Sequence, residues 1–498
     1  MDASSTRSAG ILLHPTSLPG PHGIGSLGSY ARGFIDFLAA AGQSYWQILP
    51  LGPTGYGNSP YSALSTFAGN PWLIDLQTLV TEGLLHGSEL AAAPLCTDRV
   101  DYGAVGPFKT EKLHLAAERF ATVASAERRE KFEAFEQQNA WWLDNYALFE
   151  AVKQANEGKS IRDWDTELRC REPAAIARAS QQLATEIRHQ RVMQFLFFEQ
   201  WAALRSYAHG RGVRIIGDMP IFVSFDSDVV WAHPELFKVD ANLTPSVVAG
   251  VPPDYFSATG QLWGNPLYDW KTHEKQGFNW WVDRVRMALL LADVVRLDHF
   301  RGFEAAWEVP SHHADACHGT WVKGPGNAFF DALRSELGSL PFIAEDLGLI
   351  TKEVYALRDH YGLPGMRVLQ FGFGTGEDRY NAPHRVERNS VVYTGTHDND
   401  TTVGWFRTLS AKDRAFVQSY LNTSGATIHW AMIRAAYGTV ADTVIIPIQD
   451  VLGLGSEARM NMPGQMGGWW AYRLTEQPHA AVAEKLRELT ELYERCPS

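Results

Sequence analysis

The sequence predicts an α/β protein built on a (β/α)8 barrel, with one helical insertion and one loop-rich insertion. Three observations favour this fold. Eight short apolar runs rich in β-branched residues recur along the 498 residues, helical patterns separate several of them, and three of the runs lead directly into a carboxylate. Strands that alternate with helices indicate a parallel sheet, and eight strand–helix units are the number that closes a barrel.

The eight candidate strands are spread over the whole chain, so we expect residues 1–498 to form a single barrel domain. In order, they are GILLHP (10–15), YWQILPL (45–51), VRIIGD (213–218), DVVRLD (293–298), PFIAED (341–346), MRVLQFGF (366–373), VVYTGTH (391–397) and TVIIPIQD (443–450). Apolar residues at helical spacing predict connecting helices. The expected helices cover 28–42, 278–292, 327–338, 351–361 and 480–496.

Two long segments interrupt the regular spacing of the strands. Residues 77–205 are expected to form a mainly helical subdomain, because the segment 131–155 has aromatic residues at three- and four-residue steps. These residues are Phe132, Phe135, Trp142, Tyr146 and Phe149, and we interpret the stripe as packing. Residues 219–277 are rich in Pro, Gly, Asp and aromatic residues, which indicates a long loop-rich insertion, and loops of this length are often functional.

Composition narrows the class of partner. The net charge of −12 argues against a polyanion such as nucleic acid, and it is compatible with a neutral substrate such as sugar. Four scattered cysteines without CxxC spacing indicate a reduced chain with neither a disulfide framework nor a structural zinc. We find no signal-peptide pattern and no apolar run long enough to span a bilayer, so we expect a soluble cytoplasmic protein, either a monomer or a small homo-oligomer.

Acidic residues stand at the ends of four candidate strands: Asp218, Asp298, Glu345 and Asp398. Because the carboxyl ends of parallel strands open onto one face of a barrel, these acids can converge there, as glycosidic-bond chemistry requires. Arg296 lies two residues before Asp298 on the same strand, so both side chains point the same way. The guanidinium would keep the carboxylate ionised, as a nucleophile needs, although a purely structural Arg–Asp ion pair gives the same pattern.

Glu345 and Asp346 are adjacent, so their side chains point to opposite faces of the strand. We expect Glu345 to face the site as a general acid with a pKa raised by neighbouring carboxylates, and Asp346 to cap the following helix.

In THDND (396–400), Asp398 and His397 could hydrogen-bond sugar hydroxyls, whereas Asn399 and Asp400 are typical of a turn and a helix cap. A metal site at His397, Asp398 and Asp400 is a weaker alternative, as is one at His312, His313 and Asp315.

Long uninterrupted strings of this sequence resemble the 4-α-glucanotransferases, or amylomaltases, which are relatives of the α-amylase barrels. The resemblance rests on the following segments and runs nearly from end to end: LLHPTSLPGPHGIGSLG (12–28), YWQILPLGPTGYGNSPYSALSTFAGNPWLIDL (45–76), GDMPIFVSFDSDVVW (217–231), GVPPDYFSATGQLWGNPLYDW (250–270), VVRLDHFRGF (294–303), AEDLG (344–348) and GTHDNDT (395–401). The sequence departs from the family pattern at five positions, which are Ala258, Leu262, Gln465, Trp469 and Tyr472. These departures concern the acceptor side and glucan length, and leave the three principal acids intact.

The resemblance implies a role for each matching residue. Asp298 would be the nucleophile, Glu345 the general acid and base, and Asp398 the acid that stabilises the transition state. The expected substrate-binding residues are Tyr61, Asp218, Arg296, His397, Tyr255, Phe256 and Trp263, with Tyr56 as an additional glucan contact. By the same resemblance, the insertion 219–277 lies on the acceptor side and carries Tyr255, Phe256 and Trp263.

The reaction implied by the resemblance is a retaining transfer of α-1,4-glucan segments between maltodextrins, starch or glycogen-derived glucans, without a cofactor or metal. A retaining mechanism predicts carboxyl groups about 5–5.5 Å apart at Asp298 and Glu345. Two alternatives remain at this stage. One is an α-amylase-type hydrolase, and the other is a glucan-binding protein that has kept the barrel without its activity.

Overall fold

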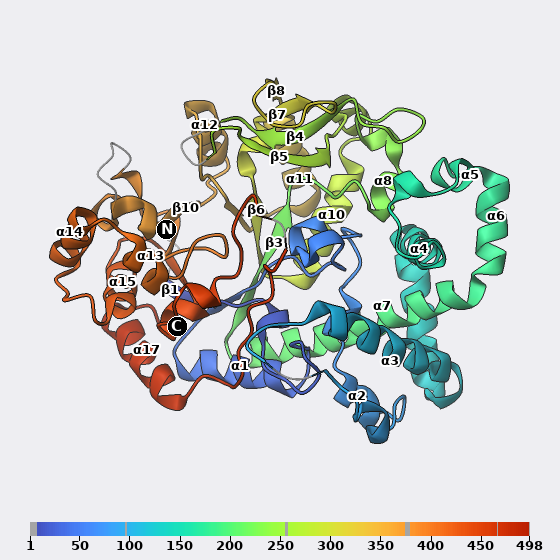
Figure 1. Ribbon diagram of the computed structural model, residues 1–498, viewed down its shortest axis with the longest axis horizontal. Coiled ribbons are helices and arrows are strands. Elements are labelled where there is room, and N and C mark those ends of the chain that lie inside the picture. The colour runs from blue at the N-terminus through green and yellow to red at the C-terminus, as the bar shows by residue number, and fades with distance from the viewer. Residues whose placement is uncertain (1–6, 95–96, 254–256, 374–378, 466, 498) are drawn as a thin grey trace.

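A closed barrel of eight parallel strands forms the centre of the computed structural model, which describes residues 7–94, 97–253, 257–373, 379–465 and 467–497 (Figure 1). Around the barrel the strands follow their order in the chain, and the last pairs with the first. They are β1 (Ser8–Leu12), β2 (Tyr45–Gln47), β3 (Arg214–Pro220), β6 (Val294–Asp298), β9 (Phe342–Ala344), β10 (Gly365–Val368), β11 (Ser390–Tyr393) and β12 (Thr443–Pro447). The eight expected strands and the barrel fold are therefore confirmed.

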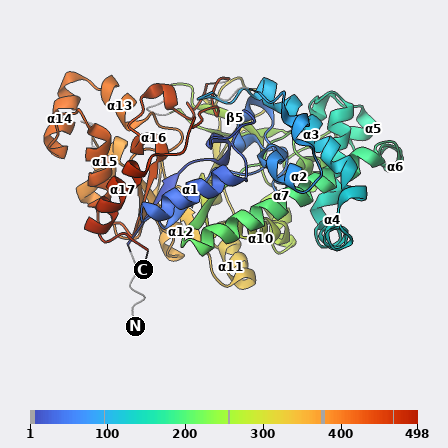
Figure 2. The same ribbon diagram turned by 90° about the horizontal axis from the view of Figure 1, so that it is seen from below.

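Helices cover the outside of the barrel, as Figures 1 and 2 show. They include α1 (Ser29–Ala40), α10 (Asn279–Leu291), α11 (Gly326–Leu337), α12 (Lys352–His360), α15 (Ile428–Tyr437) and α17 (Ala480–Leu492). All five expected helices outside the insertions are present within a few residues of their predicted bounds. Two further helices, α13 (Thr402–Thr408) and α14 (Ala411–Leu421), lie between β11 and β12, and the short helix α16 (Ile448–Val451) follows β12 directly.

The segment between β2 and β3 is largely helical and projects to one side of the barrel (Figure 1). Its helices are α2 (Leu76–Thr81), α3 (Tyr102–Val123), α4 (Ala126–Ala155), α5 (Thr166–Arg169), α6 (Pro173–Gln182) and α7 (Ala184–Gly210). Four of the five aromatic residues in the α4 stripe are buried, and Phe135 packs against the same core. The stripe is therefore packing, as expected from its helical spacing. That 77–205 forms a subdomain of its own stays a prediction.

The segment 219–277, expected to be loop-rich, contains regular structure that the sequence analysis did not foresee. It contributes β4 (Val247–Val251) and β5 (Gln261–Pro266), together with the short helices α8 (Asp228–Ala232) and α9 (Trp270–Lys275). These strands join β7 (Ala305–Pro310) and β8 (Thr320–Lys323) in a four-stranded antiparallel sheet, at the top of Figure 1. β4 and β5 pair antiparallel with each other, but the sheet was missed because its other half, β7 and β8, comes from the segment after β6 and joins it through β4.

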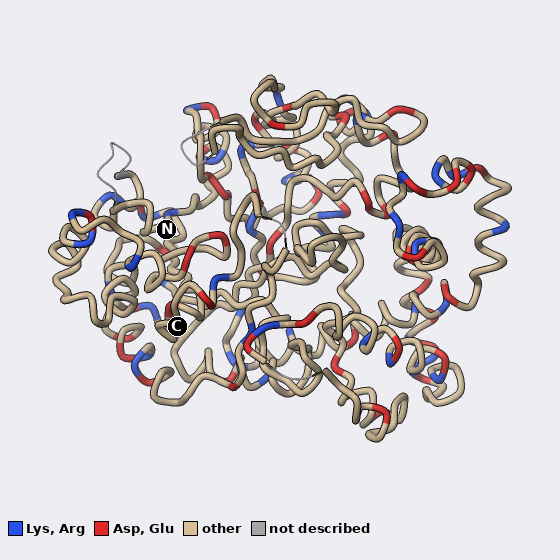
Figure 3. The backbone as a smooth tube through the Cα atoms, in the orientation of Figure 1, with Lys and Arg blue, Asp and Glu red and all other residues tan. Residues whose placement is uncertain are grey.

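Acidic and basic residues are interspersed over the helices and loops (Figure 3). Among the described residues, no helix combines the length and the apolar character required to cross a membrane.

Candidate active site

The register of the barrel strands brings two of the predicted acids to the same level of one rim. Asp218 of β3 is opposite Arg296 of β6, and Leu297 of β6 is opposite Ala344 of β9. Asp298 and Glu345 are the next residues along their strands. Because side chains alternate along a strand and pairs in register share a face, both carboxyl groups leave the rim on the same side.

Arg296 links two of the acids. Its Nη1 contacts Oδ2 of Asp218 at 2.8 Å and Oδ1 of Asp298 at 2.9 Å. The Asp218 side chain is fully buried and that of Arg296 is 5% exposed, whereas the Asp298 side chain is 28% exposed. The guanidinium thus neutralises a buried partner and also orients an accessible one. The Arg296–Asp298 ion pair expected from the sequence is therefore present, and the role of Asp298 as a nucleophile stays a prediction.

Glu345 is held by the backbone at both of its carboxyl oxygens. Oε2 accepts a hydrogen bond from the His299 N–H at 2.7 Å, and Oε1 accepts one from the Leu347 N–H at 2.8 Å. Burial raises the pKa of Glu345 to about 7, against the opposing effect of Arg296, and Asp298 adds to the rise. The sequence predicted that this pKa is raised, but it named the neighbouring carboxylates as the cause. Burial in fact contributes more to the rise than Asp298 does.

The N–H that reaches Glu345 comes from a residue with unusual backbone geometry. His299 follows directly after Asp298 and has a φ of 52°, in the left-handed region that non-glycine residues seldom adopt. This conformation ends β6 and begins a 3-10 turn over Phe300–Phe303. A sparsely populated conformation at this position couples the ends of β6 and β9, because the same residue follows one acid and donates to the other.

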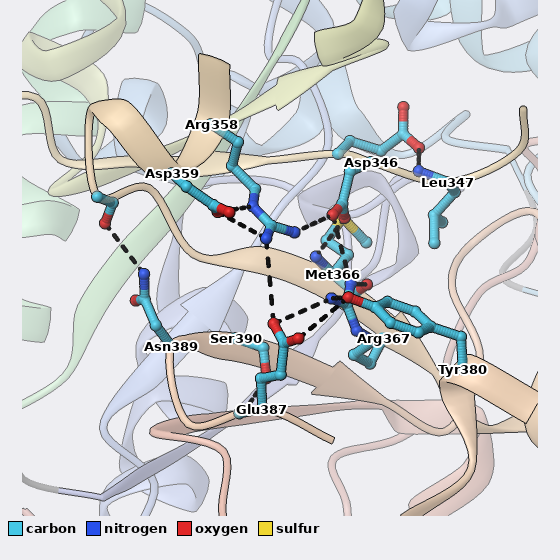
Figure 4. Close-up of polar contacts among 12 residues, drawn as sticks. Asp346, Leu347, Arg358, Asp359, Met366, Arg367, Tyr380, Glu387, Asn389 and Ser390 are labelled. Atoms are coloured by element: carbon cyan, nitrogen blue, oxygen red, sulfur yellow. Dashed lines mark hydrogen bonds and ion pairs between the residues drawn. The ribbon is translucent and has the colours of Figure 1, made fainter. Parts of the chain in front are cut away.

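Asp346 does not cap the next helix, contrary to the prediction. The residue at the N-cap of α12 is Thr351, and Asp346 instead points toward Arg358 and Arg367 (Figure 4). Its carboxylate contacts Arg358 at 2.5 Å, accepts from the Met366 N–H at 2.7 Å and contacts Arg367 at 3.3 Å. The network joins β9, α12 and β10, so it fixes the strand end from which Glu345 projects.

Asp398 lies on the loop after β11 and has its own supporting contacts. Its Oδ1 accepts a hydrogen bond from Nδ2 of Asn461 at 2.6 Å and is 3.5 Å from Nε2 of His397. Arg459 donates to the Asp398 carbonyl oxygen at 2.6 Å. The side chain of Asp398 is 42% exposed, whereas that of His397 is 6% exposed. The carboxylate is therefore accessible to solvent, and residues 459–461 fix its position through hydrogen bonds.

The neighbouring residues Asn399 and Asp400 stabilise this loop. Asn399 closes the turn by accepting hydrogen bonds from the backbone N–H and the hydroxyl of Thr396, both at 2.9 Å. The cap of α13 is Thr401 and not Asp400, whose carboxylate accepts from Ser456 at 2.7 Å.

Neither of the weak metal alternatives gains support from the geometry. Within the part of the chain that the structure describes, the set His397, Asp398 and Asp400 does not bring three ligand atoms within coordinating range of one another, nor does the set His312, His313 and Asp315.

Tyr61 connects the acids into one site. Its hydroxyl donates to Oδ2 of Asp218 at 2.8 Å, and its ring stacks on the His397 ring with centroids 5.1 Å apart. Burial raises the pKa of Tyr61, and the charges of Asp218, Asp298 and Asp398 each raise it further. Asp218 in turn shares Arg296 with Asp298, and the His397 ring that stacks on Tyr61 is in contact with Asp398. The predicted residues from β3, β6 and β11 are therefore gathered at one place.

Of the three aromatic residues predicted on the acceptor side, Trp263 belongs to the described part of the chain. Trp263 of β5 is 39% exposed, and its ring meets the His299 ring edge-to-face with centroids 4.8 Å apart. It therefore reaches the residue that follows Asp298. Tyr255 and Phe256 lie outside the described residues. Tyr56 is 84% exposed, so it is available at the surface, as an additional glucan contact would require.

Several residues at the site were not selected from the sequence. Asn461 supports Asp398, Trp470 packs against both Tyr61 and His397, and the backbone of His299 and Leu347 anchors Glu345. In the sequence, the neighbouring positions Gln465 and Trp469 stand out only as departures from the family pattern. The distance of Asn461 and Trp470 from the acids along the chain gave no indication of contact, and backbone donors carry no side-chain signal at all.

Comparisons with known proteins agree with this geometry. The family model described as 4-alpha-glucanotransferase matches residues 13–478. The 4-alpha-glucanotransferase of Thermus thermophilus is 50% identical over 97% of this chain and 99% of its own, and the chloroplastic/amyloplastic enzyme of Solanum tuberosum is 45% identical over 99% and 87%. The solved structure of amylomaltase from Streptococcus agalactiae in complex with acarbose is 38% identical, with a TM-score of 0.95 over 98% of this chain and 100% of that one. This chain belongs to the 4-alpha-glucanotransferase family.

Proposed function

We propose that this protein is a 4-α-glucanotransferase that moves a segment of an α-1,4-glucan to the 4-hydroxyl group of an acceptor glucan or glucose. The observation that carries the proposal is the arrangement of three acids in a chain of this family. Asp298 contacts Arg296, Glu345 is held by the N–H of His299, the residue after Asp298, and Asp398 contacts the His397 ring that stacks on Tyr61. The substrates are maltodextrins and the α-1,4-glucan chains of starch or glycogen. The acceptor must be another sugar, because transfer leaves the number of glycosidic bonds unchanged.

In the first half of the reaction, Asp298 attacks the anomeric carbon while Glu345 protonates the departing glycosidic oxygen. Arg296 holds Oδ1 of Asp298 at 2.9 Å and so directs Oδ2 toward the sugar. A Glu345 pKa of about 7 keeps a substantial fraction of this group protonated near neutral pH, as a general acid needs. The products are a covalent glucosyl ester on Asp298, a free 4-hydroxyl on the leaving segment and an ionised Glu345.

In the second half, the 4-hydroxyl of the acceptor attacks the ester carbon. Glu345 removes the proton of that hydroxyl, the bond to Asp298 breaks, and both groups return to their starting states. Two inversions at the same carbon leave the α configuration unchanged. Asp398, backed by Asn461 at 2.6 Å, would bind sugar hydroxyls as the ring flattens toward its oxocarbenium-like transition state.

Two surfaces complete the proposed substrate site. One surface is the stacked pair of rings of Tyr61 and His397. The buried ion pair of Asp218 and Arg296 lies next to it, because Asp218 accepts a hydrogen bond from Tyr61. Trp263 is the described aromatic residue of the acceptor-side loop, and its exposed ring is suited to cover a sugar and reduce the access of water. We assign Tyr255 and Phe256 to the same cover by resemblance alone.

The product pattern from maltotriose tests the activity. Transfer predicts glucose together with maltodextrins both shorter and longer than the substrate, with a nearly constant number of reducing ends. Glucose and maltose alone, with reducing ends rising steadily, would indicate an α-amylase-type hydrolase instead. The variant D298A should lose several orders of magnitude in turnover while it keeps its fold by circular dichroism. Normal disproportionation by D298A would disprove the nucleophile assignment.

A further inference from the structure

The helical segment beside the barrel contains a group of potential metal ligands that the proposed reaction does not use. His114 comes from α3, and Glu186 and His189 come from the first two turns of α7, which packs against α3. Figure 1 shows both helices at the side of the barrel, outside the ring of strands. Glu186 and His189 are three residues apart, so they lie on the same face of α7. The three side chains therefore converge from two helices.

The distances within this group suit a shared ion. One ligand atom from each residue lies within 4.8 Å of the other two. Oε2 of Glu186 is 3.3 Å from Nδ1 of His114 and 3.8 Å from Nδ1 of His189. Ligands bound tetrahedrally at about 2.0–2.1 Å lie roughly 3.3 Å apart. The first separation matches this value, and the second exceeds it by about 0.5 Å.

The ligand atoms have suitable surroundings. Among the described residues, the buried Nδ1 of His189 has no hydrogen-bond partner, so its lone pair is not committed elsewhere. The second oxygen of Glu186, Oε1, accepts a hydrogen bond from Gln190 at 2.7 Å, a contact that orients the carboxylate as outer-shell partners do in metal sites.

We propose that His114, Glu186 and His189 form a binding site for a divalent transition-metal ion of the zinc class, with water completing the coordination. Two imidazole nitrogens and one carboxylate oxygen are a ligand set that zinc, cobalt and nickel accept, whereas calcium and magnesium prefer oxygen alone. The three side chains are 14–26% exposed, which leaves a path for the ion and room for water. The ion would join α3 to α7 and stabilise the helical segment without taking part in glucan transfer.

The competing explanation is an ion pair between Glu186 and a protonated histidine. Such a pair needs no third partner and gives no response to added metal. The chain supplies a matched control in Glu476 and His479, another Glu-x-x-His pair with a 3.2 Å contact, whose side chains are 71% and 76% exposed. Zinc binding that persists in H114A and H189A but is lost in H479A would come from exposed surface histidines and not from the cluster.

The test uses the full-length protein after treatment with EDTA and removal of the chelator. Isothermal titration calorimetry with zinc chloride measures the stoichiometry and affinity of binding. Cobalt(II) chloride is added in a second titration, in which the visible absorption spectrum of the bound ion indicates nitrogen and oxygen ligands. We expect one equivalent to bind to the wild type and to H479A. Binding to H114A and to H189A should be weaker by at least about tenfold, since losing even an outer-shell partner costs 10- to 100-fold in affinity. Zinc should also raise the Tm of the wild type but not that of H114A.

Two results would overturn the proposal. One is binding of zinc to the wild type weaker than about 1 mM, and the other is equal affinity in the wild type, H114A and H189A. Because H114A and H189A alter different helices, circular dichroism and maltotriose turnover of both variants control for misfolding. Retained turnover with lost zinc binding would support the metal site independently of the proposed transferase function, whose failure would appear in the product pattern instead.

Discussion

Replacing Asn461 with alanine should slow transfer without unfolding the protein. The side-chain amide of Asn461 donates a hydrogen bond to Oδ1 of Asp398 at 2.6 Å, so the bond joins a neutral donor to a charged acceptor. Hydrogen bonds to charged groups contribute about 1.5–3 kcal/mol, and 1.36 kcal/mol corresponds to a factor of ten. The expected loss in kcat/KM is thus about 10- to 150-fold. Because the Asp398 side chain is 42% exposed, water can replace part of this bond, and we expect the lower half of that range.

The assay is the initial rate of glucose release from maltotriose at several substrate concentrations. A loss mainly in kcat would mean that Asn461 positions Asp398 for the transition state, whereas a loss mainly in KM would mean ground-state binding. Two contacting residues should show non-additive effects, so N461A should change the residual rate of D398N very little. Wild-type kinetics in N461A, or a full additional loss in the double variant, would refute the supporting role of Asn461.

Three further predictions follow from the charges and rings of the site. The pKa of Glu345 is raised to about 7, so its contribution to stability decreases as pH rises from about 4.5 to 7, and E345Q should gain stability relative to the wild type across that window in parallel denaturant titrations. R296M removes the partner of a buried carboxylate and should lower the free energy of unfolding by about 3–5 kcal/mol, with partial recovery on adding D218N; no loss of stability would argue against the charged pair. W263A should raise the KM for the acceptor about tenfold and increase the share of hydrolysis, measured as reducing ends per glucose released, whereas an unchanged share would show that this ring does not exclude water from the acceptor side.

The strand ends were predictable because they combine two local signals, an apolar β-branched run and an acid directly after it. Asp298 and Arg296 illustrate this, since two-residue spacing on a strand is enough to place both side chains on one face. The antiparallel sheet was not predictable, because β4 pairs on one side with its neighbour β5 and on the other with β7, which follows β6 in the chain. The same limit applies to Asn461 and to His114, whose partners lie far away in the chain and meet them only in the folded protein.

The most consequential feature of the site is the backbone at the junction of Asp298 and His299. The nucleophile assigned to Asp298 and the acid assigned to Glu345 come from different strands, yet the N–H of His299, the residue after Asp298, donates to the Glu345 carboxyl group. The left-handed φ of His299 redirects the chain that follows, so that the Phe300 N–H donates to the Glu345 carbonyl oxygen at 3.2 Å, a contact that extended geometry at His299 would remove. The separation of the two carboxyl groups is therefore governed by main-chain geometry as well as by side-chain rotamers. Changes of the His299 side chain should consequently matter less for this separation than changes that disturb its φ angle, and asparagine, which tolerates the left-handed region, should be accepted better than valine.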